Sequence, residues 1–239
     1  MEPNINQTQN PAVNQWIVPV AIVIAGALIA TSLYFSRTDR PVDSNPETEA
    51  ISKAAEQAIV IKDDDHVRGD RNADVKIIEY SDMECPFCKQ FHTTMNQVFD
   101  EYNGKIAWVY RHFPIQKIHP KAVREAVASE CVAELGNEDK FWSFLDKFYK
   151  ITPSNNETDL SILPTLAKEL GIKEADFNTC LDSGKYDARI CAQFNEGIAT
   201  GGTGTPWSLV VTKSGRILSI NGAQDYAVVK QIIETALND

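Results

Sequence analysis

The stretch VKIIEYSDMECPFCKQF, residues 75–91, decides the fold of this chain. Residues 75–80 are a run of mostly β-branched and aromatic side chains, long enough for a buried strand. After the two cysteines, apolar residues recur at spacings of three and four, which predicts an amphipathic helix that ends near Gly104. These residues are Phe87, Phe91, Met95, Val98, Phe99 and Tyr102. Residues 105–113 are a second strand, so the segment predicts a βαβ unit with parallel strands.

The chain after this unit divides at a glycine-rich break, GGTGTP, at residues 201–206. Before the break, residues from about 117 to 200 carry several apolar stripes with helical spacing. After the break, residues 207–220 predict an antiparallel hairpin, and residues 226–237 predict a final helix. The order βαβ, helical block, ββα predicts an α/β, thioredoxin-like fold with a helical insertion between its two halves.

The N-terminal part has a different character. Residues 16–35, WIVPVAIVIAGALIATSLYF, contain no charge and predict one transmembrane helix, because their length spans roughly the 30 Å hydrocarbon core. The polar tail 1–15 holds no Lys or Arg and the apolar run is long, so an uncleaved anchor is favoured over a cleaved signal peptide. Residues 36–56 are polar with two prolines and predict a linker. The globular domain is then expected at residues 57–239.

The charge and cysteine counts limit the possible functions. The chain has 23 Lys and Arg against 33 Asp and Glu, a formal net charge of −10, and residues 1–40 contribute none of it. This balance argues against nucleic acid as a partner, which needs a basic surface. A hydrophobic content of 43% argues against wholesale disorder. The five cysteines are an odd number, so at least one is unpaired or pairs only transiently.

The chemistry is expected at the C-x-x-C pair, Cys85 and Cys88, which opens the first helix of the domain. The N–H groups and dipole of a helix N-terminus stabilise a thiolate at Cys85, whereas Cys88 lies one turn further in. Pro86 suits the first helical turn. Cys85 therefore attacks, or is attacked in a mixed disulfide, and Cys88 resolves it. A zinc site with His92 as a third ligand is a less favoured alternative, because no second C-x-x-C is present, and no metal is expected.

EYSDMECPFCKQF at residues 79–91, followed much later by GTGTPW at residues 202–207, resembles the DsbA-like family of thioredoxin-fold thiol–disulfide oxidoreductases. The resemblance covers about residues 65–237, and its most specific motif is C-P-F-C between a strand and a helix. It implies that Cys85 is the nucleophilic cysteine and Cys88 the resolving one.

The same resemblance assigns further site residues. Pro206 matches the family's cis-proline, and Thr205 before it would present its backbone to a substrate strand; an ordinary trans bond is the alternative. Glu79 matches the acidic residue beneath the active site, where burial would raise its pKa and let it relay the proton of Cys88. A solvent-facing Glu79 is the alternative, because strand alternation does not fix its face. Phe87 in the active-site loop and Trp207, together with Met83, are expected to form an exposed apolar surface that binds substrate.

Three cysteines remain outside the C-x-x-C pair. Cys131 and Cys180 lie on apolar stripes of the predicted insertion, in contexts that resemble those of relatives, and a disulfide between them is favoured. A bridge from Cys180 to Cys191 across the turn at Gly184 competes with it, and buried free thiols are a third possibility. Either bridge implies an oxidising compartment.

Together with the predicted span at residues 16–35, the resemblance implies a membrane-anchored enzyme that forms or exchanges disulfides in extracytoplasmic proteins. Its substrates would be unfolded or reduced secreted proteins, a separate redox partner would recycle it, and no cofactor is needed. A monomeric oxidase is favoured over an isomerase or reductase, because residues 1–56 leave no room for the dimerisation domain of the fold's isomerases. A non-catalytic peptide-binding module is a further alternative.

Membrane orientation is the one point where the indications conflict. Arg37 and Arg40 are the basic residues that flank the predicted span, and the positive-inside rule then favours a cytoplasmic domain. The cysteine chemistry favours the opposite side. We expect a single-pass protein of the cell membrane with its catalytic domain on the extracytoplasmic side.

Overall fold

The computed structural model describes residues 46–239, and a five-stranded sheet lies at the centre of this part of the chain. The strands are β1 (His66–Arg68), β2 (Val75–Ser81), β3 (Ile106–His112), β4 (Trp207–Val211) and β5 (Ile217–Asn221). Their order is β1-β3-β2-β4-β5. β2 and β3 are parallel and the other neighbouring pairs are antiparallel. The predicted βαβ unit and the predicted hairpin are therefore confirmed, whereas the three-residue β1 was not anticipated.

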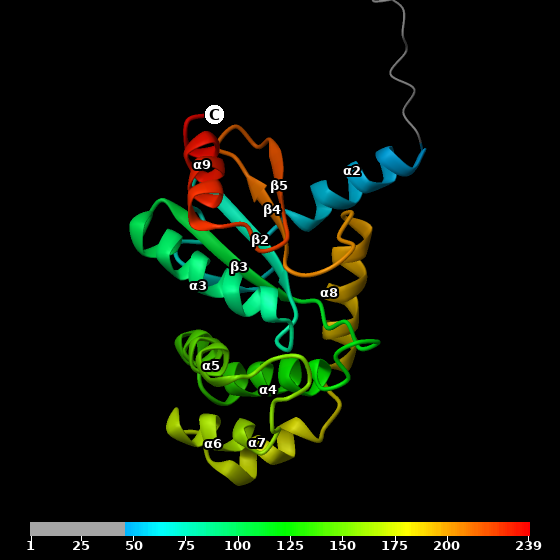
Figure 1. Ribbon diagram of the computed structural model, residues 1–239, viewed down its shortest axis with the longest axis vertical. Coiled ribbons are helices and arrows are strands. Elements are labelled where there is room, and N and C mark those ends of the chain that lie inside the picture. Colours follow the sequence, from blue (N-terminus) through cyan, green and yellow to red (C-terminus); the bar gives the residue numbers. More distant parts are fainter. Residues whose placement is uncertain (1–45) are drawn as a thin grey trace, which may run out of the picture. The chain divides into compact units, whose positions relative to one another are not determined.

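Helices cover both faces of the sheet and one of its ends (Figure 1). They are α2 (Pro46–Ala58), α3 (Pro86–Glu101), α4 (Ala122–Leu135), α5 (Glu138–Ile151), α6 (Ile162–Glu169), α7 (Glu174–Leu181), α8 (Asp187–Ala199) and α9 (Tyr226–Leu237). α3 and α9 lie on one face, α2 and α8 lie on the other, and α4 to α7 gather beyond the end of the sheet (Figure 1). The helical insertion between the two halves is thus confirmed.

Alternation along β2 divides its side chains between two hydrophobic cores. Val75 and Ile77 are fully buried in the core that contains α3, α9 and the insertion. Ile78 and Tyr80 are fully buried on the opposite face, with side chains of α2 and α8. Each large apolar side chain buried in this way contributes about 1.5–3 kcal/mol. Glu79 has the same parity as Ile77, so its carboxyl points toward α3.

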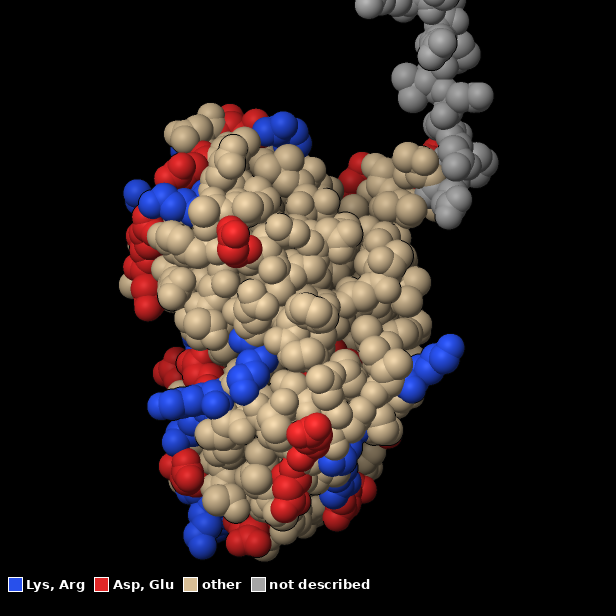
Figure 2. Space-filling model, in the orientation of Figure 1, with Lys and Arg blue, Asp and Glu red and all other residues tan. Residues whose placement is uncertain are grey.

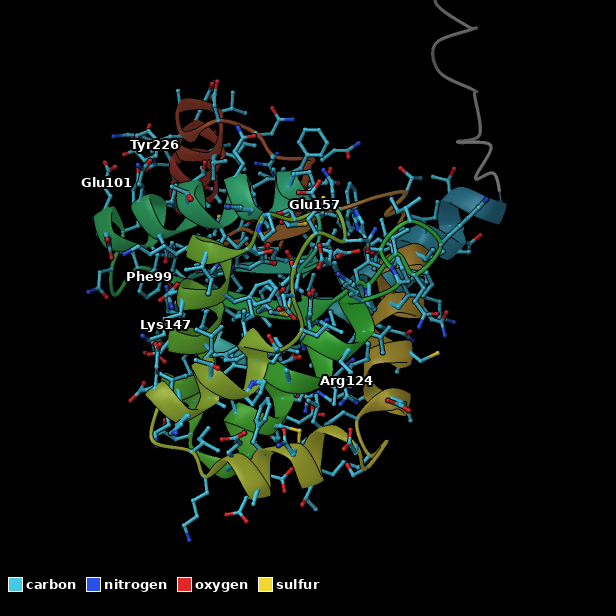
Figure 3. The ribbon with its side chains drawn as sticks, turned by 60° about the horizontal axis from the view of Figure 1, so that its bottom comes forward. Phe99, Glu101, Arg124, Lys147, Glu157 and Tyr226 are labelled. Carbon is cyan, nitrogen blue, oxygen red and sulfur yellow. A yellow bond between two sulfur atoms is a disulfide. The ribbon has the colours of Figure 1, made fainter. Side chains whose placement is uncertain are left out.

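α3 and α9 lie side by side on their face of the sheet, and the labelled Glu101 and Tyr226 mark neighbouring parts of these helices (Figure 3). Lys230 of α9 donates a hydrogen bond of 2.6 Å to Glu101 of α3. Asp225 is the N-cap of α9, and its side chain accepts from the Val228 N–H at 3.2 Å. The cap satisfies one of the unpaired donors at the start of the helix, as its sequence position indicates.

A fully buried arginine, Arg111 of β3, holds the opposite face together. Its guanidinium donates to the Ala58 carbonyl at the end of α2 (2.6 Å) and to the Val60 carbonyl (3.0 Å). It also donates to Asp65 (2.6 Å) and to Glu196 of α8 (2.6 Å). The two carboxylates compensate the buried charge, and Asp65 binds the guanidinium through both of its oxygens, a bidentate geometry that suits arginine.

A linker was predicted over residues 36–56, with the domain starting at residue 57. This prediction is wrong for residues 46–56, which belong to a helix of the domain. α2 begins at Pro46, and its Ala55 and Ala58 are buried against the domain. The buried stripe of α2 is built largely from alanines, so its apolar periodicity was too weak to stand out. The predicted tail 1–15, the predicted span 16–35 and the first part of the linker lie outside the described residues. Within residues 46–239, no helix has the length and apolar character needed to cross a membrane.

Candidate active site

Cys85 occupies the N-cap position of α3, where the chain passes from extended into helical conformation (φ −76°, ψ 123°). Pro86 is the first helical residue, so the N–H that proline lacks costs the helix nothing. The thiol of Cys85 lies 3.6 Å from the backbone carbonyl of Thr205. A segment 120 residues away in sequence therefore faces the first cysteine directly.

The two thiols are both free, and their pKa values are displaced in opposite directions. The hydrogen bond from the Cys88 thiol lowers the pKa of Cys85 to about 6, and the N–H groups of Phe87 and Cys88 act in the same direction. Cys88 is fully buried, and desolvation raises its pKa well above the ordinary value. Cys85 is thus the thiolate near neutral pH, and Cys88 keeps its proton until it reacts.

The peptide bond between Thr205 and Pro206 is cis, as the resemblance implied. Trp207 follows it at the start of β4, and its indole N–H donates to the Thr200 hydroxyl at the end of α8 (3.0 Å). Trp207 and Phe194 both pack against the core on the α2 and α8 face. The backbone of Thr205, at the cis bond, therefore lies at the thiol, whereas the ring of Trp207 is held toward α8.

Glu79 lies fully buried on the α3 side of β2, which excludes the solvent-facing alternative. Its Oε2 accepts a hydrogen bond of 2.8 Å from the Trp108 indole N–H, and its Oε1 is buried without a partner. Burial raises the pKa of this carboxyl to about 7, while the hydrogen bond from Trp108 opposes the shift. A carboxyl in this state can accept or give a proton near neutral pH.

A group of buried hydroxyls, not anticipated from the sequence, lies beside Glu79 and Cys88. Ser81 Oγ and the Tyr149 hydroxyl are 3.2 Å apart, and the hydroxyls of Tyr149 and Tyr110 are 3.0 Å apart. Tyr110 is the β3 partner of Glu79 in the parallel ladder. From the sequence, the register of the βαβ unit could have placed only Tyr110 beside Glu79. Tyr149 could not have been found in this way, because it comes from α5 in the insertion. We call Ser81, Tyr110 and Tyr149 the hydroxyl cluster.

The turn before Cys85 is fixed by a buried carboxylate, Asp82. It accepts hydrogen bonds from the N–H groups of Glu84 (2.9 Å) and Ile115 (2.7 Å). It also contacts His119 Nδ1 at 2.9 Å. His119, which follows the second strand in the sequence, therefore contributes by holding Asp82 rather than by touching the thiols.

The connection between α5 and α6 is fastened to the same turn. Ser154, Asn155 and Asn156 all have positive φ values of 65°, 52° and 65°. The Asn155 N–H donates to the Glu84 carbonyl (2.8 Å), and the Asn156 N–H donates to the Glu84 carboxylate (2.6 Å). Asparagine tolerates this backbone region better than most residues. The helical insertion thus contacts the residue that directly precedes Cys85.

Exposed apolar side chains lie in the active-site loop and in the segment that follows β3. Phe87 is 60% exposed and Ile118 is 57% exposed. The expectation that Met83 belongs to this surface is wrong, because Met83 is buried in the core on the α3 side. Uncharged residues occupy the middle of the face shown in Figure 2, and charged side chains gather along one margin and at the helical end.

His92 does not join the two cysteines in a metal site. Its Nε2 lies 2.7 Å from an oxygen of Asp146, and its ring packs against Trp108 and Tyr149. Among the residues that the structure describes, no group of three or more His, Cys, Asp or Glu side chains is arranged to hold a metal ion.

The remaining cysteines separate into one bridge and one free thiol. Cys131 of α4 and Cys180 of α7 form a disulfide, with 5.8 Å between their Cα atoms. Cys191 of α8, the competing partner, is free and exposed. The packing of α4 against α7 brings the bridged pair together, so the pairing favoured from the resemblance is the one in the structure.

Comparisons with known proteins place these features in context. Residues 62–235 match the family described as thioredoxin. The chain is 34% identical over 141 residues to the Na(+)/H(+) antiporter NhaA 3 of Salinispora tropica, a match that covers 57% of this chain and 21% of the antiporter. The chain therefore spans about a fifth of the length of the curated relatives it matches.

Two solved structures have a similar fold. Alpha-DsbA1 of Wolbachia pipientis superposes with a TM-score of 0.66 at 21% identity, covering 76% of this chain and 95% of that one. DsbA2 of Pseudomonas aeruginosa superposes with a TM-score of 0.63 at 24% identity, covering 75% of this chain and 98% of that one. Sequence identities this low establish the fold alone. The expected DsbA-like thioredoxin fold is therefore confirmed, as a fold.

Proposed function

Because this chain belongs to the thioredoxin family, we propose that it is a thiol–disulfide oxidoreductase that acts on other proteins through Cys85 and Cys88. One observation carries the proposal: a thiol with a pKa lowered to about 6 lies at a helix N-terminus, 3.6 Å from the Thr205 carbonyl, with a second, buried thiol behind it. This asymmetry supplies a nucleophile and a resolving group in one site.

The exchange follows from the geometry. A substrate strand pairs with the backbone at Thr205, next to the thiol of Cys85. In the oxidising direction, a substrate thiolate attacks Cys85 in the Cys85–Cys88 disulfide, and Cys88 leaves with the electron pair and takes up a proton. A second substrate thiolate then attacks the substrate sulfur of the mixed disulfide, and Cys85 leaves as a thiolate. The substrate gains a disulfide, and the protein ends with two reduced cysteines.

The lowered pKa of Cys85 supports the oxidising direction. A stabilised thiolate is a good leaving group, and stabilising the reduced protein makes its disulfide a stronger oxidant. The alternative is a reductase or isomerase with the same pair of cysteines. The reduction potential discriminates between them: a value well above thioredoxin's roughly −270 mV indicates an oxidant, and a value near it indicates a reductant.

For the setting, we propose a membrane-anchored, monomeric enzyme with its domain on the extracytoplasmic side, acting on unfolded or reduced secreted proteins and recycled by a separate redox partner. The disulfide between Cys131 and Cys180 supports an oxidising compartment. The exposed Phe87 in the active-site loop suits substrates of varied sequence. A reporter fused to the C-terminus tests the orientation, and a cytoplasmic signal would overturn it. The antiporters are matched over only about a fifth of their own length, and we propose no ion transport from them.

The activity test uses a reduced, unfolded secreted protein as the substrate and follows the appearance of its disulfides. We expect the oxidised full chain to transfer its disulfide in stoichiometric amount, and Cys85→Ser to abolish transfer. When the substrate instead already carries a disulfide, the Cys85 thiolate of Cys88→Ser should attack it and remain trapped in a mixed disulfide, because no second thiol is present to resolve it. Cys191→Ser is the matched control, because this thiol lies in α8 outside the site. Equal transfer by wild type and Cys85→Ser would refute the proposed function.

A further inference from the structure

An exposed apolar residue, Ile118, is held in a hydrogen-bonded turn beside the active site. Its side chain is 57% exposed, while its N–H donates to the Ile115 carbonyl (3.0 Å). The turn is bonded to Asp82 through the Ile115 N–H (2.7 Å) and through His119 Nδ1 (2.9 Å). The carbonyl of Asp82 accepts from the Cys85 N–H (3.1 Å). The backbone of Ile118 therefore has a fixed position relative to the first cysteine.

Asn156, from the connection between α5 and α6, bonds to this turn as well. Its Nδ2 donates to the Ile118 carbonyl (2.5 Å), and its backbone N–H donates to the Glu84 carboxylate (2.6 Å). Its own carbonyl accepts from the Lys121 ammonium (2.6 Å) just before α4. Asn156 therefore joins three segments: the residue before Cys85, the turn that carries Ile118, and the start of α4.

The loop that carries Asn156, residues 152–158, is itself anchored. The buried hydroxyls of Thr152 and Thr158 lie 2.7 Å apart and close the loop. Lys89, in the first turn of α3, donates to the Thr152 carbonyl (2.5 Å). The loop thus holds Asn156 in place before any substrate arrives.

A single exposed apolar side chain is ordinary on a protein surface. Ile118 differs because its turn is bonded to the active-site turn and, through Asn156, to the helical insertion. A side chain fixed in advance binds a partner with less loss of conformational entropy than a mobile one. These bonds therefore prepare Ile118 for contact with a substrate chain that reacts at Cys85.

We propose that Asn156 is a positioning residue for polypeptide substrates: its bond to the Ile118 carbonyl holds the Ile118 side chain where an apolar residue next to the reacting cysteine of the substrate packs against it. The proposal rests on the proposed thiol–disulfide exchange and deepens it by naming a preferred substrate class. Small disulfides, which do not extend to Ile118, do not depend on Asn156.

The test uses two synthetic peptides that each contain a pair of reduced cysteines and differ only in carrying leucine or serine beside them. The oxidised full chain is mixed with excess peptide, quenched with acid and analysed by chromatography, so that one turnover is followed. The dependence of the rate on peptide concentration gives a half-saturating concentration and a limiting rate. All proteins carry Cys191→Ser, because this exposed free thiol would otherwise exchange with the products.

Asn156→Gly removes the side-chain bond and keeps the backbone, since glycine accepts the φ of 65°. We expect the half-saturating concentration of the leucine peptide to rise about fourfold, the effect of losing contact with about one methylene group. The limiting rate should stay within about twofold, as for an interaction made equally in the ground and transition states. The serine peptide should be unaffected.

Two further comparisons establish that Asn156 acts through Ile118. Ile118→Ser should weaken binding of the leucine peptide by itself, and adding Asn156→Gly should cause no further loss. The matched control is Asn238→Gly, because Asn238 also donates through Nδ2 to a backbone carbonyl, that of Glu234 at the end of α9 (2.8 Å). This variant should transfer its disulfide to both peptides as the parent does.

A readout with Ellman's disulfide excludes an effect on the cysteines themselves. The reduced chain should release thionitrobenzoate at the same rate with and without Asn156→Gly. Equal slowing with Ellman's disulfide and with the leucine peptide would place the effect on the turn before Cys85 and would overturn the positioning role.

The outcomes also separate this role from the proposed function. A parent protein that transfers its disulfide to neither peptide overturns both. Normal transfer by the parent, with an unchanged half-saturating concentration in Asn156→Gly, overturns the positioning role alone, and so do additive losses in the double variant. If Asn156→Gly does not fold, Ile118→Ser decides, because it alters an exposed side chain; unchanged binding of the leucine peptide would then refute the proposal.

Discussion

Replacing Glu79 by glutamine should make the reduced protein more stable at alkaline pH and leave it little changed in acid. The carboxyl is fully buried with one oxygen unpaired, so its charged form is costly. Burial raises its pKa from 4.5 to about 7. The folded protein therefore holds a proton that the unfolded chain releases, and stability must fall as the pH rises between these values.

The size of the effect follows from that displacement. Each tenfold change in proton affinity corresponds to about 1.4 kcal/mol, so the full difference is about 3 kcal/mol. Below pH 4.5 the carboxyl is protonated in both states and contributes nothing. Between pH 4.5 and 7 the wild type loses stability, and above pH 7 the loss is complete. Glutamine does not titrate, so Glu79→Gln escapes this loss.

The assay is urea unfolding of the reduced wild type and variant at several pH values between 4 and 9. The difference in unfolding free energy between the two proteins should grow by about 3 kcal/mol from acid to alkaline pH. Comparing the two ends of the range removes any constant cost of placing an amide next to Trp108. Parallel stability curves across the whole range would refute the assignment of Glu79 as a carboxyl that is protonated in the folded state.

Three further predictions test other parts of the structure. The ultraviolet absorbance of the thiolate should show Cys85 titrating near pH 6, and titration above pH 8 would contradict the site geometry. Arg111→Met leaves the buried carboxylate of Asp65 without its partner, which should cost about 3–5 kcal/mol in urea unfolding; an unchanged midpoint would show that the ion pair is dispensable. Replacing Cys131 and Cys180 together by serine opens a loop with a sequence separation of 49, which should cost up to about 4 kcal/mol, and a melting temperature equal to that of wild type would argue against a stabilising bridge.

The elements that could be predicted from the sequence are those with a strong local pattern. The strand at residues 75–80 and the helix after Cys85 have continuous β-rich or amphipathic character, and the structure has them within a residue or two. α2 was missed because its buried side chains are small, Ala55 and Ala58. β1 was missed because three residues carry no readable alternation.

The candidate site likewise has one part that could be predicted from a local pattern and one part that could not. The C-x-x-C pair is visible because its chemistry is local to one turn of helix. The hydroxyl cluster is not, because Tyr149 reaches Ser81 only through the packing of α5 against the domain. The partners of Arg111 are equally remote, since Asp65 precedes it by 46 residues and Glu196 follows it by 85. Buried polar groups of this kind are selected by tertiary neighbours, which a single sequence does not display.

The Arg111 contacts also determine how mechanical force enters the domain. Arg111 joins the last residues of α2 to β3 and α8, on the sheet face opposite to α3. A pull applied at Pro46 is therefore transmitted along α2 into β3, and it reaches the sheet without crossing the turn that holds Cys85. Peeling α2 away requires breaking the hydrogen bonds that Arg111 donates to the carbonyls of Ala58 and Val60, the first of which is buried. The contacts that anchor α2 are thus separate from the contact between Cys85 and the Thr205 carbonyl.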